Sequence, residues 1–234
     1  MSDFISVIIL VLAMLISASM QLVPSTFSIF YHYALGKTSF KKADDRSLSF
    51  ITGVELFIGL TWFLVYIILL LLCCQTDILY HGLLFWAISG ILVAESILIL
   101  FFYFGHGTTL FISRRTATAL STSSRKAKSR QDGIVLGFCS GLPELIFTLP
   151  LYIISAIILL STSTIPRAPI VILYIIFSVL PLFVTQIYFR TGHNLAGLLR
   201  LRLHLKPYLR IIISLAYFLL AIATLNLGVL LYGR

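Results

Sequence analysis

Residues 48–72 have the sequence LSFITGVELFIGLTWFLVYIILLLL, in which Glu55 is the single charged residue. A helix rises about 1.5 Å per residue and the hydrocarbon core of a bilayer is roughly 30 Å thick, so about 20 apolar residues cross it. The run is therefore predicted to be a transmembrane helix. Five further runs meet the same criterion, at 4–35, 81–112, 134–160, 168–189 and 208–232.

The composition of the whole chain agrees with this assignment. Of its 234 residues, 59% are hydrophobic and 11% are charged, whereas a soluble domain has about 25% charged and 45–50% apolar residues. A soluble enzyme, a disordered chain and a disulfide-stapled domain are thereby excluded. The fold class expected is all-α, an integral membrane bundle of six transmembrane helices.

Known chemical motifs are missing from the sequence. It contains no GxSxG, Walker A or GxGxxG pattern, and its five histidines show no HxxxH or HExxH spacing. Such motifs position nucleophiles, phosphates or metal ions. We therefore expect no enzymatic activity, no cofactor and no metal site.

The basic residues indicate the topology. Three alternate loops, 36–47, 113–133 and 190–210, hold 4, 6 and 5 of the 17 lysines and arginines. The positive-inside rule places these loops in the cytoplasm and both termini outside the inner (plasma) membrane, with the first span retained as a helix. We expect the loops to contact anionic lipid headgroups and no nucleic acid. Loop 113–133 would link two three-helix halves, 1–112 and 134–234.

Two spans contain a proline near the middle of the bilayer. The first carries Gln21, Pro24, Ser25 and Thr26, and the fourth carries Ser140, Pro143 and Glu144. Proline removes a backbone donor and kinks or unwinds a helix. Counted from the cytoplasmic face, the prolines lie at depths of roughly 18 and 15 Å, on helices of opposite direction. A 3+3 inverted repeat would pair these two helices.

Interrupted helices at matching places of two inverted halves point to a transporter site. The freed backbone groups are tolerated only inside protein or beside a wet cavity. We therefore predict a substrate site; its members would be Gln21, Pro24, Ser25, Thr26, Ser140, Pro143 and Glu144. The alternative is that both prolines are ordinary packing kinks.

Three glutamates, Glu55, Glu95 and Glu144, lie within predicted spans. Ionisable side chains at bilayer depth are costly and often mark ion, proton or substrate paths. Glu144 would contact a cationic group or carry a proton, with Glu55 or Glu95 as proton relay. The alternative is that hydrogen-bonded glutamates tie helices together. Gly53 and Gly59, on either side of Glu55, would let another helix approach closely.

Four segments resemble the LysE/RhtB-type superfamily of small amino-acid exporters. They are Val23–Pro24–Ser–Thr26 with the basic turn after Gly36, Phe102–Tyr–Phe–Gly105 through Arg115, Gly137 to Glu144, and Leu199 to Arg210. The chain lacks the Pro-Gly-Pro triplet of that family, and Glu144 follows Pro143 where the family has lysine. The resemblance implies six helices and export more than it implies amino acids as cargo.

Together these observations predict a secondary transporter. It would export a small solute, amino-acid-like or cationic, from a site at the broken first and fourth helices. The alternative function is a non-transporting membrane scaffold or assembly partner. A homo-oligomer is compatible with either function.

Overall fold

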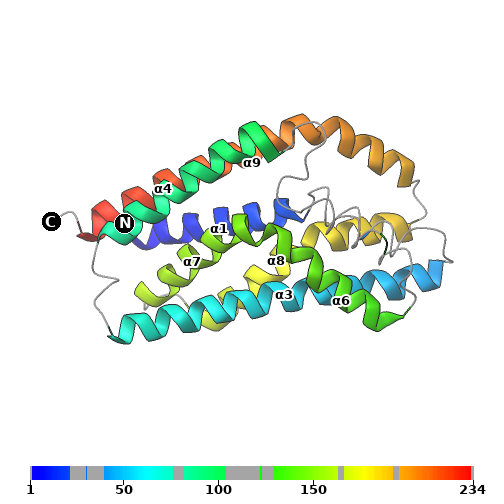
Figure 1. The fold of residues 1–234 in the computed structure, drawn as a ribbon, viewed down its shortest axis with the longest axis horizontal. Helices are drawn as coiled ribbons and strands as arrows, with labels where there is room; N and C mark the ends of the chain where they lie inside the picture. The colour runs from blue at the N-terminus through cyan, green and yellow to red at the C-terminus, as the bar shows by residue number, and fades with distance from the viewer. Residues whose placement is uncertain are drawn as a thin grey trace.

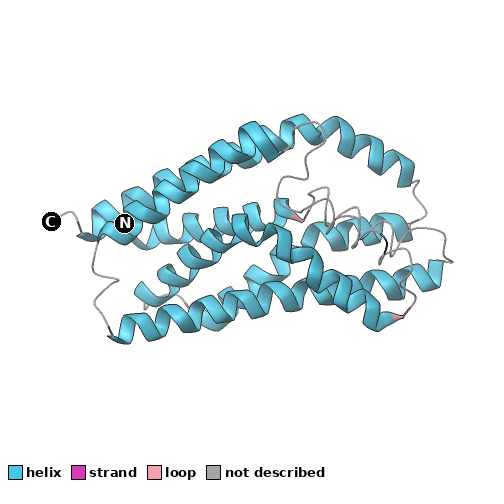
Figure 2. Ribbon diagram, in the orientation of Figure 1, coloured by secondary structure: helices cyan, strands magenta, loops and turns pink. Residues whose placement is uncertain are grey.

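The protein is an elongated bundle of helices (Figure 1). The computed structural model describes residues 2–21, 30, 40–75, 82–103, 122, 129–162, 166–191 and 195–232. Within these residues the regular secondary structure is entirely helical (Figure 2). Six helical segments are long and apolar enough to cross a membrane, which confirms the predicted six-span, multi-pass membrane protein.

Each of these helices overlaps one of the predicted apolar runs. Their bounds are α1 Ser2–Met20, α3 Phe40–Gln75, α4 Gly82–Leu98 with the π-helical turn η3 Ile99–Tyr103, α6 Arg130–Gly141, the 3-10 turn η4 Leu142–Glu144, α7 Leu145–Ser161, α8 Arg167–Arg190 and α9 Leu195–Tyr232. The N- and C-termini lie at one end of the bundle (Figure 1). We call this the terminal end, and the opposite end, where α3, α6 and α9 begin, the basic end.

Three helices begin well inside segments that the sequence predicted to be basic loops. Helix α3 begins inside the expected loop 36–47, α6 inside 113–133, and α9 inside 190–210. For α6 the cause is a capping box, in which Ser129 Oγ accepts from the Asp132 backbone N–H at 3.1 Å and Asp132 accepts from the Ser129 N–H at 2.9 Å. A capping box satisfies two backbone donors at a helix start.

Glycines bring α3 and α6 into backbone contact. A Cβ atom at Gly53 would overlap the Ile134 carbonyl oxygen, and one at Gly137 would overlap the Phe50 carbonyl oxygen. Small residues allow such approach between membrane helices. The prediction that Gly53 admits another helix is therefore confirmed, and the partner is α6. We call this the glycine contact.

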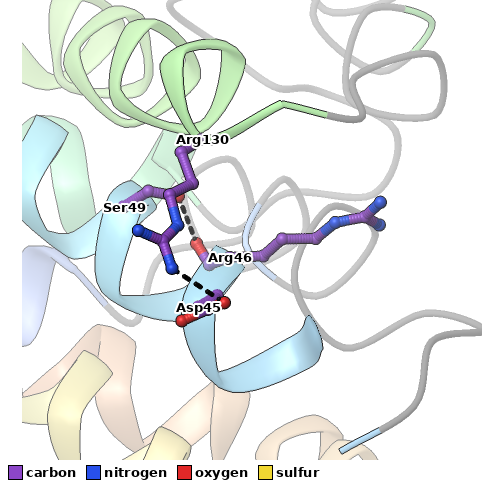
Figure 3. Close-up of polar contacts among 4 residues, drawn as sticks. All are labelled: Asp45, Arg46, Ser49 and Arg130. Atoms are coloured by element: carbon purple, nitrogen blue, oxygen red, sulfur yellow. Dashed lines mark hydrogen bonds and ion pairs between the residues drawn. The ribbon is translucent and has the colours of Figure 1, made fainter. Parts of the chain in front are cut away.

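An ion pair joins the same two helices at the basic end. Arg130 Nη2 of α6 lies 2.9 Å from Asp45 Oδ2 of α3, while Ser49 Oγ donates to the Arg46 carbonyl oxygen at 2.9 Å (Figure 3). Both charged side chains are largely exposed, at 72% and 48%. Exposed pairs contribute about 0–1 kcal/mol, so the glycine contact dominates this interface.

The span formed by α6, η4 and α7 lies at the centre of the bundle. In an 18-residue apolar stretch of this span 67% of residues are buried, against 28% in the equivalent stretch of the α3 span. Helix α7 packs against α1, α3 and α4. The Tyr217 hydroxyl of α9 also donates to the Phe147 carbonyl oxygen of α7 at 2.8 Å.

Candidate functional site

The central span is interrupted near its middle. Helix α6 ends at Gly141, residues Leu142–Glu144 form the 3-10 turn η4, and α7 begins at Leu145. Pro143 stands at the start of η4 and has no backbone N–H to continue the α-helical pattern. The interruption lies about 20 Å from Arg130 along the helix. The predicted break at Pro143 is thus present as a 3-10 turn.

Glu144 begins a polar stripe that continues along α7. Glu144, Thr148 and Tyr152 recur every four residues, which places them on one helix face. Their side chains are 3%, 2% and 1% exposed. Thr148 Oγ1 donates to the Glu144 carbonyl oxygen at 3.2 Å. The interruption therefore directs a carboxyl group, and the hydroxyls after it, into the protein interior.

The stripe meets polar side chains of α1 and α8. The Tyr152 side chain interacts with Thr148 and Ser17 and lies near the Glu144 carboxyl group. Its ring packs edge-on against Tyr174, with centroids 5.9 Å apart. Ser178 Oγ donates to Ser17 Oγ at 2.9 Å. We call Ser17, Glu144, Thr148, Tyr152, Tyr174 and Ser178 the polar cluster.

The other predicted members of the substrate site are placed as follows. Gln21 lies one turn after Ser17 and is 3% exposed, and its Oε1 atom has no hydrogen bond in the described part of the chain. Ser140 is buried in α6, and its hydroxyl donates to the Gly137 carbonyl oxygen at 2.7 Å. Pro24, Ser25 and Thr26 lie outside the described residues. The structure thus buries Gln21 directly after α1 and Glu144 directly before α7, and α1 packs against α7.

The two remaining carboxylates lie elsewhere. Glu95 is 4% exposed on α4, the helix that pairs with α9, and next to it Ser96 donates to the Ser214 carbonyl oxygen at 2.8 Å. Glu55 lines an open groove beside Ile175 of α8. A relay through either glutamate to Glu144 stays a prediction.

Sequence reasoning missed Ser17, Thr148, Tyr152, Tyr174 and Ser178. The predicted site rested on the two prolines, the polar residues beside them and the charged residues. The signal was nevertheless present, because Glu144, Thr148 and Tyr152, like Tyr174 and Ser178, are spaced by four residues. Polar residues at helical spacing inside an apolar span predict a shared interior face.

The chemistry of the polar cluster is that of a small binding site. It offers one carboxyl group and five hydroxyl groups at the centre of the bundle. The Tyr174 hydroxyl has no hydrogen-bond partner within the described residues, although it lies near Ser17. Buried polar atoms without partners are uncommon in native proteins. The arrangement can hold an ammonium group or a proton at the carboxyl.

The comparisons with known proteins found no relative of this chain. The resemblance to LysE/RhtB-type exporters therefore stays a prediction. No protein-family model, curated protein or solved structure matches the chain.

Proposed function

We propose that the protein is a secondary transporter of a small solute with a cationic amine group, bound at the polar cluster. The observation that carries this proposal is a buried carboxyl beside an interrupted helix in the central span. Ionisable residues inside a membrane protein mark substrate or proton paths. The position of both termini outside the inner membrane is part of the proposal and rests on the basic loops, and export rests on the resemblance to LysE/RhtB-type exporters.

The helix contacts support an inverted repeat of three plus three spans. In this repeat α1 corresponds to the span α6–α7, α3 corresponds to α8, and α4 corresponds to α9. The contact between α1 and α8 then corresponds to the contact of α3 with α6–α7. The contact between α1 and α9 corresponds in the same way to the contact between α4 and α7. Each span also contacts its own counterpart. Such repeats are frequent in secondary transporters, with the site at their interface.

A pair of serines supports the same relation in detail. Ser96 Oγ donates to the Ser214 carbonyl oxygen, and Ser214 Oγ donates to the Ser96 carbonyl oxygen, both at 2.8 Å. This reciprocal pair is what a two-fold axis between α4 and α9 would produce. The serines are 118 positions apart, and Pro24 and Pro143 are 119 apart (143 − 24). Two unrelated features thus give nearly the same repeat length.

Transport would require the polar cluster to open to each side in turn. The cluster joins α1, α7 and α8, and its members are at most 3% exposed. In the proposed cycle Glu144 would pair with the amine of the solute, or hold a proton in its place. Exchange of solute and proton at one carboxyl would couple their movements.

The alternative function is a non-transporting membrane scaffold or assembly partner. The closure of the polar cluster favours it, because fully buried hydroxyls can also hold helices together. Under this alternative the buried carboxyl would stabilise the bundle and no solute would move.

The two functions are separated by flux into proteoliposomes. The assay would offer labelled amino acids and small amines, with and without a proton gradient. We expect saturable flux for the parent and flux at the level of protein-free vesicles for Glu144→Gln, because the variant cannot pair with an amine or release a proton. Flux at background for the parent across the whole panel would eliminate transport and leave the scaffold.

Asp45→Asn is the matched control, because it also replaces one carboxylate by an amide but at the exposed basic end. It should retain the parental flux. Equal flux for the parent and Glu144→Gln would show that transport does not use the polar cluster.

A further inference from the structure

An open groove lies on the outer surface of α3, away from the polar cluster. Its volume is about 420 Å³, and it is lined by α3 residues between Thr52 and Phe63 and by Ile175 of α8. The α3 residues recur at three- and four-residue intervals, so they form one face of the helix. Small-molecule sites typically measure 300–1,000 Å³, and the groove falls within that range.

The groove faces the hydrocarbon region of the membrane. Leu56, Leu60 and Phe63 line it and are 53%, 56% and 58% exposed, within the span Asp45–Leu72. Glu55 lies ten residues after Asp45, about 15 Å into the span. The groove is therefore accessible to molecules that dissolve in the bilayer.

Glu55 is the charged residue of the groove lining. Within the described part of the chain, no hydrogen bond or ion pair joins its side chain to another residue. The neighbouring Thr52 hydroxyl donates to the Leu48 carbonyl oxygen at 3.0 Å, so its proton is engaged by its own helix. A carboxyl at this depth is costly unless a partner compensates it.

Charge complementarity selects the occupant. A second copy of the chain, docked by two-fold symmetry, would bring one Glu55 towards the other. A cation delivered by the bilayer would instead neutralise the carboxylate in a low-dielectric setting, where ion pairing is strong. The apolar walls require that this cation carry a hydrocarbon chain.

We infer that the groove binds a single-chain cationic amphiphile, with its ammonium group at Glu55 and its chain along α3 towards Phe63. These two residues are eight positions apart, about 12 Å along the helix. The contact is non-covalent and does not depend on whether the polar cluster transports a solute.

The test is photolabelling of the full-length protein in zwitterionic lipid vesicles. The probe is dodecylammonium with a diazirine at the end of its chain, and labelled peptides are located by mass spectrometry. We expect saturable labelling of α3 between Leu56 and Phe63. Dodecyltrimethylammonium should compete with the probe, whereas dodecanol, with the same chain and no charge, should not.

Two variants make the test decisive. Glu55→Gln should reduce the saturable labelling at least tenfold, while the charge control Asp45→Asn should leave it unchanged. Leu60→Trp fills the groove from a lipid-exposed position, so it should fold normally and also abolish labelling. Unsaturable labelling of the parent, equal competition by dodecanol, or full labelling of Glu55→Gln would each overturn the inference.

Discussion

The glycine contact and the polar cluster are two helix interfaces of opposite character. At the glycine contact, α3 and α6 meet backbone to backbone, with no space for a single methyl group at Gly53 or Gly137. At the polar cluster, α1, α7 and α8 meet through hydroxyls such as the Ser17–Ser178 hydrogen bond at 2.9 Å. In the proposed repeat the α3–α6 contact is the counterpart of the α1–α8 contact.

The two interfaces differ in how readily they can rearrange. Backbone contacts rely on van der Waals packing, which is lost steeply when the surfaces separate. Hydroxyl groups can exchange one partner for another, and hydrogen bonds inside membrane proteins contribute only about 0.6 kcal/mol on average. We expect the glycine contact to carry stability and the polar cluster to carry function.

The largest effect should follow from a methyl group at the glycine contact. Gly137→Ala forces a Cβ atom against the Phe50 carbonyl group, and overpacking of this kind costs about 1–3 kcal/mol, or more where backbones must move. Unfolding in detergent would measure the loss. Gly90→Ala is the matched control, because no atom lies within 4 Å of the added Cβ. Equal stability of the two variants would contradict the tight contact.

A smaller effect on stability, with a large effect on flux, is expected at Tyr152. Tyr152→Phe removes one hydroxyl from the polar cluster. Tyr217→Phe is the matched control, because it removes a hydroxyl outside the cluster, which donates to the Phe147 carbonyl oxygen at 2.8 Å. Each should cost about 0.6–1.7 kcal/mol of unfolding free energy. Only Tyr152→Phe should lower vesicle flux, by about tenfold. Parallel losses of flux would show that the cluster has no special role.

The smallest effect is expected at the basic end. Asp45→Asn breaks the exposed ion pair with Arg130 and should change the unfolding free energy by less than about 1 kcal/mol. The difference from the parent should shrink further in 1 M salt, because screening shortens the range of surface charges to about 3 Å. A loss as large as that for Gly137→Ala would reverse the ranking of the two α3–α6 contacts.

Much of the fold could be predicted because continuous apolar runs determine where the membrane-spanning helices lie. The six spans follow from the length of these runs, and the interruption follows from Pro143, whose ring excludes a regular helical hydrogen bond. The burial of Glu144 and Gln21 also agrees with the prediction that they belong to the interior. Helix starts were harder to predict, since the capping box at Ser129 lies in a polar, basic stretch.

The contact partners of each side chain could not be predicted from the amino-acid sequence alone. That Tyr152 meets Ser17 and Tyr174 depends on how three helices rotate and cross. Likewise, nothing in the sequence distinguished Glu55, which lines a lipid-facing groove, from Glu95, which is 4% exposed. Both lie in apolar runs, and only the packing of neighbouring helices separates them.

The 3-10 turn η4 divides the central span into two parts with different contacts. Helix α6 before it meets α3 backbone to backbone at Gly137, whereas α7 after it carries Thr148 and Tyr152 and packs against α1, α3 and α4. A change of angle at Leu142–Glu144 would therefore move α7 relative to α6 and would also shift the contact between α3 and α7. The turn would act as a hinge that itself bears the carboxyl group of Glu144, directly after the helix that Gly137 holds against α3.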